Sequence, residues 1–259
     1  MKKLFKMSAV ILFVLIVFSA CGRNESVSGK ITSFPPYGER VVTAIAAGYG
    51  LDSQEDNYLT LFSDNIGAVL NNDAVSGYDS GEVLKSLSDG KTAADIKNAD
   101  AIVVSVGGND FFHRKDTMID ALKNALLHGE GFFPEEVTNI YDEYEKNLSR
   151  IIDEIKNMNP DAYIIVQTVY NPFLKQTLNF SYINVGKTAN RYVARLNDSI
   201  KNVCKTKNRV FVFDVAPEMN EDAENFYGTD EKLDIHPTKH GHATLARVFT
   251  EKFNGLLKD

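Results

Sequence analysis

The sequence predicts one α/β domain in which helices cover both faces of a five-stranded parallel sheet. From residue 40 onward, short β-branched runs alternate with amphipathic helical stretches, an alternation typical of parallel sheets covered by helices. The 259 residues are 44% hydrophobic and 24% charged, as in ordinary globular proteins. Domains of this class commonly stay undivided at roughly 200–250 residues, so we expect a single domain over residues 39–259.

Short apolar runs define the expected strands, which span residues 41–45, 73–75, 101–106, 162–169 and 210–214. Apolar residues at helical spacing predict helices over residues 137–157, 188–205 and 240–257. Pro160 ends the first of these helices, and Cys204 in the second is expected to fill the core. Residues 116–134 are expected to hold a helix and a surface insertion.

Charge and cysteine content exclude several classes of protein. The net charge of −7 is spread along the chain with no block of Lys or Arg, so no nucleic-acid partner is expected. Cys21 and Cys204 are the only cysteines and lie in different contexts, which argues against a disulfide framework or a cysteine metal site. The five histidines lack metal-ligand spacing, so neither a metal nor a cofactor is expected.

The N-terminus has the layout of an export signal. Lysines within the first six residues precede an apolar run over residues 9–18, which is too short for the roughly 20 residues of a membrane-spanning helix. Phe18-Ser19-Ala20-Cys21 resembles a bacterial lipobox, with Phe18 where an aliphatic residue is usual. The resemblance implies a signal peptide over residues 1–20 and a lipidated Cys21.

The lipobox resemblance further implies a polar tether over residues 21–38 and a protein anchored to the outer face of the bacterial cytoplasmic membrane. A diacylglycerol on the cysteine carries two acyl chains, which suffice for stable anchoring. The alternative is a plain cleaved signal with an incidental cysteine.

Polar residues follow three of the expected elements at the sheet edge where ligand sites form. Gly77 follows the second strand, and Asn109, in Gly-Gly-Asn-Asp, follows the third. A glycine N–H and an asparagine amide can both donate to an oxyanion. His236, in Asp-Ile-His-Pro before the last helix, suits a general base beside a carboxylate. Ordinary turns and a buried, hydrogen-bonded histidine are the alternatives for each motif taken alone.

Together these segments resemble the SGNH (GDSL) hydrolases, since the motifs VSG, GGND and HPTKHGHATLA match that family in sequence and in order over residues 40–257. The resemblance implies a three-layer, flavodoxin-like fold and a lipase- or esterase-type hydrolase acting on acyl esters such as lipids or acylated sugars. It also implies oxyanion-hole roles for Gly77 and Asn109, and His236 as the base that activates a serine.

The family's Gly-Asp-Ser motif is absent from the end of the first strand, although the following Ala-Gly-Tyr-Gly-Leu fits the family. An ungapped alignment places Ala44 where the serine belongs. A second alignment, which we favour, removes about four residues between Ile45 and Ala46 and keeps a normal strand length. Either way the serine Oγ and its backbone donor are lost. Ser53, beyond the glycine run, is a further alternative as a relocated nucleophile.

The acidic member of the triad is also displaced. The family's aspartate usually lies three residues before the histidine, where this chain has Leu233. Asp234 is assigned the role, and Asp230 is the alternative.

Three functional hypotheses follow. The first is an ester hydrolase of the SGNH type, favoured by the retained His236 and Asn109. The second is a catalytically inactive pseudoenzyme that binds acyl or carbohydrate ligands at the cell envelope, favoured by the lost motif. The third is a structural lipoprotein that displays a partner surface, which leaves the retained site residues unexplained.

Overall fold

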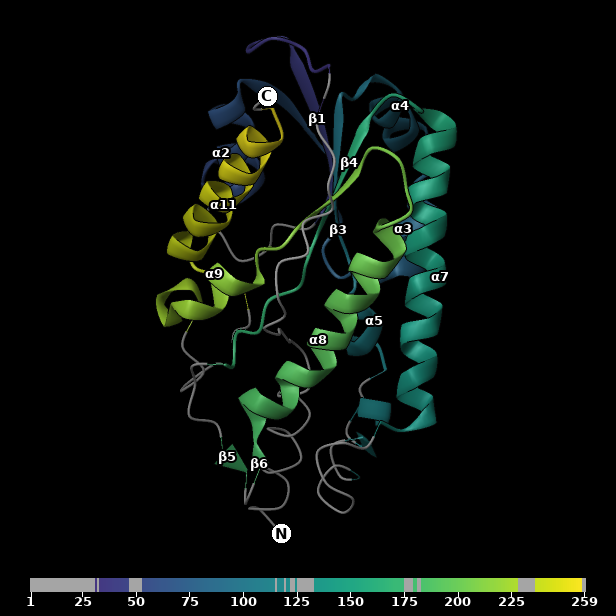
Figure 1. Ribbon diagram of the computed structural model, residues 1–259, viewed down its shortest axis with the longest axis vertical. Coiled ribbons are helices and arrows are strands. Elements are labelled where there is room, and N and C mark those ends of the chain that lie inside the picture. The colour runs from purple at the N-terminus through teal and green to yellow at the C-terminus, as the bar shows by residue number, and fades with distance from the viewer. Residues whose placement is uncertain are drawn as a thin grey trace.

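The computed structural model describes residues 31, 33–46, 53–114, 116–118, 120–121, 124, 133–174, 179–180, 183–227 and 236–257 (Figure 1). Its main sheet has five parallel strands in the order β2-β1-β3-β4-β7, which confirms the predicted fold class. The strands are β1 (Arg40–Ala46), β2 (Ala68–Asn72), β3 (Ala101–Ser105), β4 (Tyr163–Gln167) and β7 (Val210–Phe213). A separate antiparallel pair joins β5 (Asn179–Phe180) to β6 (Ile183–Asn184).

Two layers of helices enclose the sheet, one on each face (Figure 1). One layer contains α3 (Ser80–Ser86), α4 (Gly90–Asn98), α7 (Glu135–Met158) and α8 (Val185–Cys204). The other contains α2 (Tyr58–Ile66), α9 (Ala216–Glu221) and α11 (Lys239–Leu257). Short elements complete the described chain: α5 (Gly108–Phe112), η1 (Gln54–Asp56) and η2 (Ala223–Asn225).

The central strand β3 shows why the sheet needs both layers. Its residues are buried in alternation, with Ile102 and Val104 in the core beneath α7 and α8, and Ala101 and Val103 in the core beneath α2 and α11. Burying each of the branched side chains of Ile102, Val103 and Val104 contributes about 1.5–3 kcal/mol. The continuous apolar run in the sequence therefore reflects a strand with no solvent-facing side.

The long helices agree with the apolar periodicity. The buried stripe of α7 contains Ile140, Tyr144, Leu148, Ile151 and Ile155, four or three residues apart. Cys204 at the end of α8 is fully buried, as expected, and burial raises the pKa of its thiol to about 12. Of the 116–134 segment, the described residues 116–118, 120–121 and 124 are helical.

The predicted position of the second strand was wrong. β2 spans Ala68–Asn72, and residues 73–75 lie in the loop that follows it. Among the residues that the structure describes, the strand pairs with β1 alone and leaves Val69 61% exposed, so it lacks the apolar run of an interior strand. The Asn72 side chain accepts a hydrogen bond from the Ala74 N–H (3.1 Å), and this local turn ends the strand.

No helix among the described residues is long and apolar enough to cross a membrane.

Candidate functional site

The strand order fixes where a ligand site can form. β1 lies between β2 and β3, and the chain leaves β1 toward the α2 face but leaves β3 toward the α7 face. Such a reversal opens a crevice at the carboxyl ends of the strands. These ends point toward the lower part of Figure 1, the side on which α5 and the start of α8 lie.

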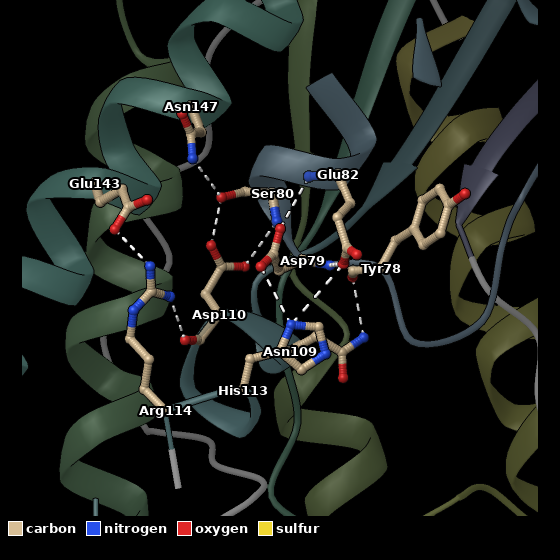
Figure 2. A network of polar contacts seen from close by, with 10 residues as sticks. All are labelled: Tyr78, Asp79, Ser80, Glu82, Asn109, Asp110, His113, Arg114, Glu143 and Asn147. Atoms are coloured by element: carbon tan, nitrogen blue, oxygen red, sulfur yellow. Dashed lines mark hydrogen bonds and ion pairs between the residues drawn. The ribbon is translucent and has the colours of Figure 1, made fainter. Parts of the chain in front are cut away.

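A hydrogen bond links the first turn of α5 to the loop that contains Gly77. The Asn109 Nδ2 atom, in the first turn of α5, donates to the carbonyl oxygen of Tyr78 at 3.0 Å (Figure 2). Tyr78 directly follows Gly77, which has φ +89°, a backbone conformation that favours glycine. The amide nitrogen keeps a second hydrogen for a ligand. The structure therefore places Asn109 in contact with the residue that follows Gly77.

A tight turn sets the direction of α5. Gly107 has φ +134°, and a Cβ added there would lie 3.0 Å from the Tyr144 ring. The Tyr144 hydroxyl donates to the carbonyl oxygen of Val106 at 3.0 Å, and this hydrogen bond connects α7 to the residue that follows β3. Only glycine fits the turn that delivers Asn109 to the sheet edge.

A buried carboxylate forms a second tie between the same two loops (Figure 2). Asp110 is 2% exposed, and its carboxylate accepts hydrogen bonds from the Ser80 hydroxyl and, at 3.1 Å, from the Ser80 N–H. The Asn147 side chain on α7 donates to the Ser80 hydroxyl at 3.0 Å. Burial raises the pKa of Asp110 to about 6, although the Ser80 donors oppose this shift.

A histidine and two carboxylates lie next to this network. Asp79 caps α3 and forms a capping box with Glu82. The His113 Nδ1 atom lies 3.2 Å from Asp79 Oδ2 and 3.9 Å from Glu82 Oε2. Burial alone would raise the pKa of Asp79, but the N–H groups of Glu82 and Gly81 and the His113 side chain together lower it.

His236 lies just before α11, half-buried. The next residue, Pro237, is buried and forms an isolated antiparallel β-bridge with Phe226. The Thr238 N–H donates to the carbonyl oxygen of Asn225 at 2.9 Å. These contacts fix the backbone after His236 against η2.

The remaining predicted site residues divide into two groups. Cys21, Asp230 and Asp234 lie outside the described residues. Ala44 is fully buried within β1, with Asn72 and Val103 as its strand partners, and the Ile45–Ala46 junction lies at the strand end, where Ala46 pairs with Ser105.

Ser53 has a structural role. Its hydroxyl accepts a hydrogen bond from the Glu55 N–H at 3.2 Å and caps η1.

Two groups of side chains could hold a cation within the described part of the chain: Asp79, Glu82 and His113, and also Asp222, Glu224 and His240. In both groups the aspartate already accepts a backbone N–H as a helix cap. These caps explain both groups without an ion.

The Ser80, Asp110 and Asn147 network was missed at the level of sequence. The sequence feature that could have indicated it is Asp110, directly after Asn109, because a carboxylate buried beside a site motif needs a hydrogen-bond donor. Ser80 lies 30 residues from Asp110 along the chain, and Asn147 lies 67 residues from Ser80, so no local spacing connects them.

Comparison with known proteins identifies a family and one related sequence. A model of the GDSL-like lipase/acylhydrolase family matches residues 45–244. The uncharacterized protein YpmR of Bacillus subtilis is 28% identical over 190 residues, which cover 73% of this chain and 68% of YpmR.

Solved structures show the same fold. The lipase Lip_vut3 from a goat rumen metagenome has a TM-score of 0.59 at 17% identity, covering 82% of this chain and 96% of its own. Phospholipase A1 from Streptomyces albidoflavus has a TM-score of 0.58 at 16% identity, covering 83% of this chain and 99% of its own. With the family model spanning most of the domain and its motifs gathered at one sheet edge, the chain belongs to the GDSL-like lipase/acylhydrolase family.

Proposed function

We propose that this domain binds acyl esters at the Gly77 N–H and the Asn109 amide, and that the family's serine route of hydrolysis is lost. One observation carries the proposal. The Asn109 to Tyr78 hydrogen bond holds Asn109 against the residue that follows Gly77, whereas β1 has the sequence RVVTAIA and ends without a serine. An acyl ester therefore finds its oxyanion donors but not the family's nucleophile.

The class of ligand follows from the donors and the relatives. A backbone N–H and a side-chain amide in neighbouring loops are the kinds of donor that suit a carbonyl oxygen gaining negative charge. Lip_vut3 is described as a lipase and the Streptomyces protein as a phospholipase A1, so both act on acyl esters. We infer the same class of ligand here, with lipids and acylated sugars as the two forms.

The packing of β1 supports the alignment that interrupts the chain after Ile45. Ala44 lies in the apolar core, fully buried. A serine hydroxyl at that position would be buried in the core and would not reach the sheet edge. The end of β1 is where a strand-terminal serine would face the crevice.

Binding of a tetrahedral anion tests the proposal. We expect the purified full-length chain to bind methyl butylphosphonate, an anion shaped like the ester's tetrahedral intermediate, in isothermal calorimetry. Asn109→Ala should weaken binding about 10- to 100-fold, because a hydrogen bond to a charged group is lost. Asn98→Ala is the matched control, since the exposed Asn98 amide donates to the carbonyl oxygen of Ala94 within α4.

No binding by the unmodified chain, or equal binding by Asn109→Ala, would remove the basis of the proposal. Rapid turnover of p-nitrophenyl butyrate that disappears in Ser53→Ala would instead make the protein a serine hydrolase with a relocated nucleophile.

We also propose that Cys21 carries lipid and anchors the domain to the membrane. The support is the short apolar run that ends in Ser19-Ala20-Cys21. When the full chain is expressed in a bacterium and the cells are fractionated, it should sediment with membranes, and Cys21→Ala should be released. Equal release of both proteins would contradict the anchor.

A further inference from the structure

A second histidine–aspartate pair lies beside the oxyanion donors. His113 follows Asn109 by four residues, and the His113 N–H donates to the Asn109 carbonyl oxygen at 3.0 Å, so both side chains leave the same side of α5. Asn109 contacts Tyr78, and His113 contacts the next residue, Asp79 (Figure 2). The pair is therefore built into the two loops that carry the donors.

The contacts of His113 decide which ring nitrogen is basic. Nδ1 faces two carboxylate oxygens, at 3.2 Å on Asp79 and 3.9 Å on Glu82. With its proton on Nδ1, the ring donates to Asp79 Oδ2, and the lone pair of the neutral ring then lies on Nε2. The His113 side chain is 43% exposed, so water reaches the ring.

Asp79 is fixed independently of the histidine. Its Oδ1 accepts the Glu82 N–H at 2.9 Å, and its own N–H donates to Glu82 Oε2 at 3.0 Å. The capping box thus holds the carboxylate that orients the imidazole. Base, orienting carboxylate and neighbouring oxyanion donors form the arrangement that activates a nucleophile in hydrolases.

We infer that His113, oriented by Asp79, is a general base that activates water for a slow hydrolysis of the bound ester without any serine. This rests on the proposed binding of esters at Gly77 and Asn109. Nε2 takes a proton from water as the water oxygen bonds to the carbonyl carbon. The ester C–O bond then breaks, and the same proton passes to the departing alkoxide, which leaves a carboxylic acid and an alcohol.

The chain contains a matched pair for comparison. His240 Nε2 lies 3.0 Å from Asp222 Oδ2, and the side chains are 53% and 47% exposed. Among the described residues, no hydrogen bond links this second pair to α5 or to the loop that contains Gly77. The two pairs share their chemistry and differ in the oxyanion donors beside them.

Hydrolysis of p-nitrophenyl butyrate by the full-length chain, with EDTA present, tests the inference. His113→Ala should lower kcat/KM about 100-fold, the usual range for a general base. Asp79→Asn should lower it about 10-fold while keeping the melting temperature, because asparagine caps a helix as well as aspartate. His240→Ala should leave the rate unchanged. Added imidazole should restore activity to His113→Ala, which a purely structural histidine would not allow.

The outcomes separate this inference from the binding proposal. If the chain binds methyl butylphosphonate but hydrolyses the ester no faster than buffer, or equally fast after His113→Ala, the dyad is not a base and the binding proposal stands. If the phosphonate does not bind, the binding proposal fails. A rate abolished by EDTA would overturn the general-base mechanism in favour of water on a metal held by Asp79, Glu82 and His113.

Discussion

The loops after β2 and β3 differ sharply from the end of β1, although all three lie at the same sheet edge. Two hydrogen bonds connect the loop after β2 to the loop after β3, Asn109 to Tyr78 and Ser80 to Asp110, and they join residues about 30 positions apart. Asn147 adds a contact from α7. β1 instead ends in the sequence Ala-Ile-Ala. The two loops proposed to hold the ester are thus hydrogen-bonded to each other, while the position proposed for the nucleophile depends on one short stretch of chain.

Restoring the nucleophile should give the largest effect. Insertion of Gly-Asp-Ser-Ile between Ile45 and Ala46 is expected to raise ester hydrolysis on the order of 10³-fold, because it supplies the serine that His236 can activate. The increase should vanish when Asn109→Ala or His236→Ala is added. The measurement is kcat/KM for p-nitrophenyl acetate and butyrate.

The triple variant Ala44→Ser, Thr43→Asp and Val42→Gly is the control for the ungapped alignment. It should stay inactive and lose stability, since all three positions are buried in β1. Activity in this variant and not in the insertion would reverse the choice of alignment. If both variants fold and neither hydrolyses the ester, the remaining site residues do not support catalysis by a serine.

Stability should show the same contrast between regions. Asp110→Ala leaves the buried Ser80 N–H and hydroxyl without their acceptor, at an expected cost of about 2–4 kcal/mol in the free energy of unfolding. Ser53→Ala removes only the cap of a short η1 turn near β1, for about 0.5–1 kcal/mol. Urea unfolding of both variants checks this, and equal losses would contradict the contrast.

Acidification should raise the contribution of Asp110 to the free energy of unfolding. Because burial raises the pKa of Asp110 to about 6, the folded state binds this proton more tightly than the unfolded state. The stabilisation is present below the ordinary pKa of aspartate and is lost as pH rises through about 6. Relative to Asp110→Asn, the unmodified chain should gain about 2–3 kcal/mol between pH 7 and pH 4 in urea unfolding. A pH-independent difference between the two proteins would show that Asp110 does not titrate in this range.

A further effect on stability concerns the turn that begins α5. Gly107→Ala should destabilise the fold by about 1–3 kcal/mol, because φ is +134° and the Tyr144 ring lies 3.0 Å from the new Cβ. Gly108→Ala is the matched control, since no heavy atom lies within 4 Å of its Cβ, and it should be neutral or slightly stabilising. Thermal unfolding compares them, and equal melting temperatures would refute the demand for glycine at 107.

The sequence predicted the interior of the fold better than its edges. β3 and α7 carry long apolar patterns, and both were placed within two residues of their observed ends. β2 was misplaced because an edge strand with exposed Val69 has no such pattern.

The candidate site was predictable where one motif carries one role. The parallel sheet predicted from the sequence places the residues after β2 and β3, Gly77 and Asn109 among them, at the same sheet edge. The partners of Asp110 and the His113–Asp79 pair could not be predicted, because they depend on how α3 and α7 pack against α5. Those contacts are set by tertiary structure and leave no spacing in the sequence.

The register of β1 has a consequence for how this family can evolve. The strand ladder runs to Ala46 opposite Ser105, so residues gained or lost after Ile45 leave the upstream pairs, from Arg40 to Ile45, unchanged. A short deletion there removes the nucleophile without requiring the fold to rearrange, and a short insertion restores it. Catalysis and foldability are then separate traits, and a lineage can abandon its chemistry, keep its ligand site for another use, and regain the reaction through a single small change in the gene.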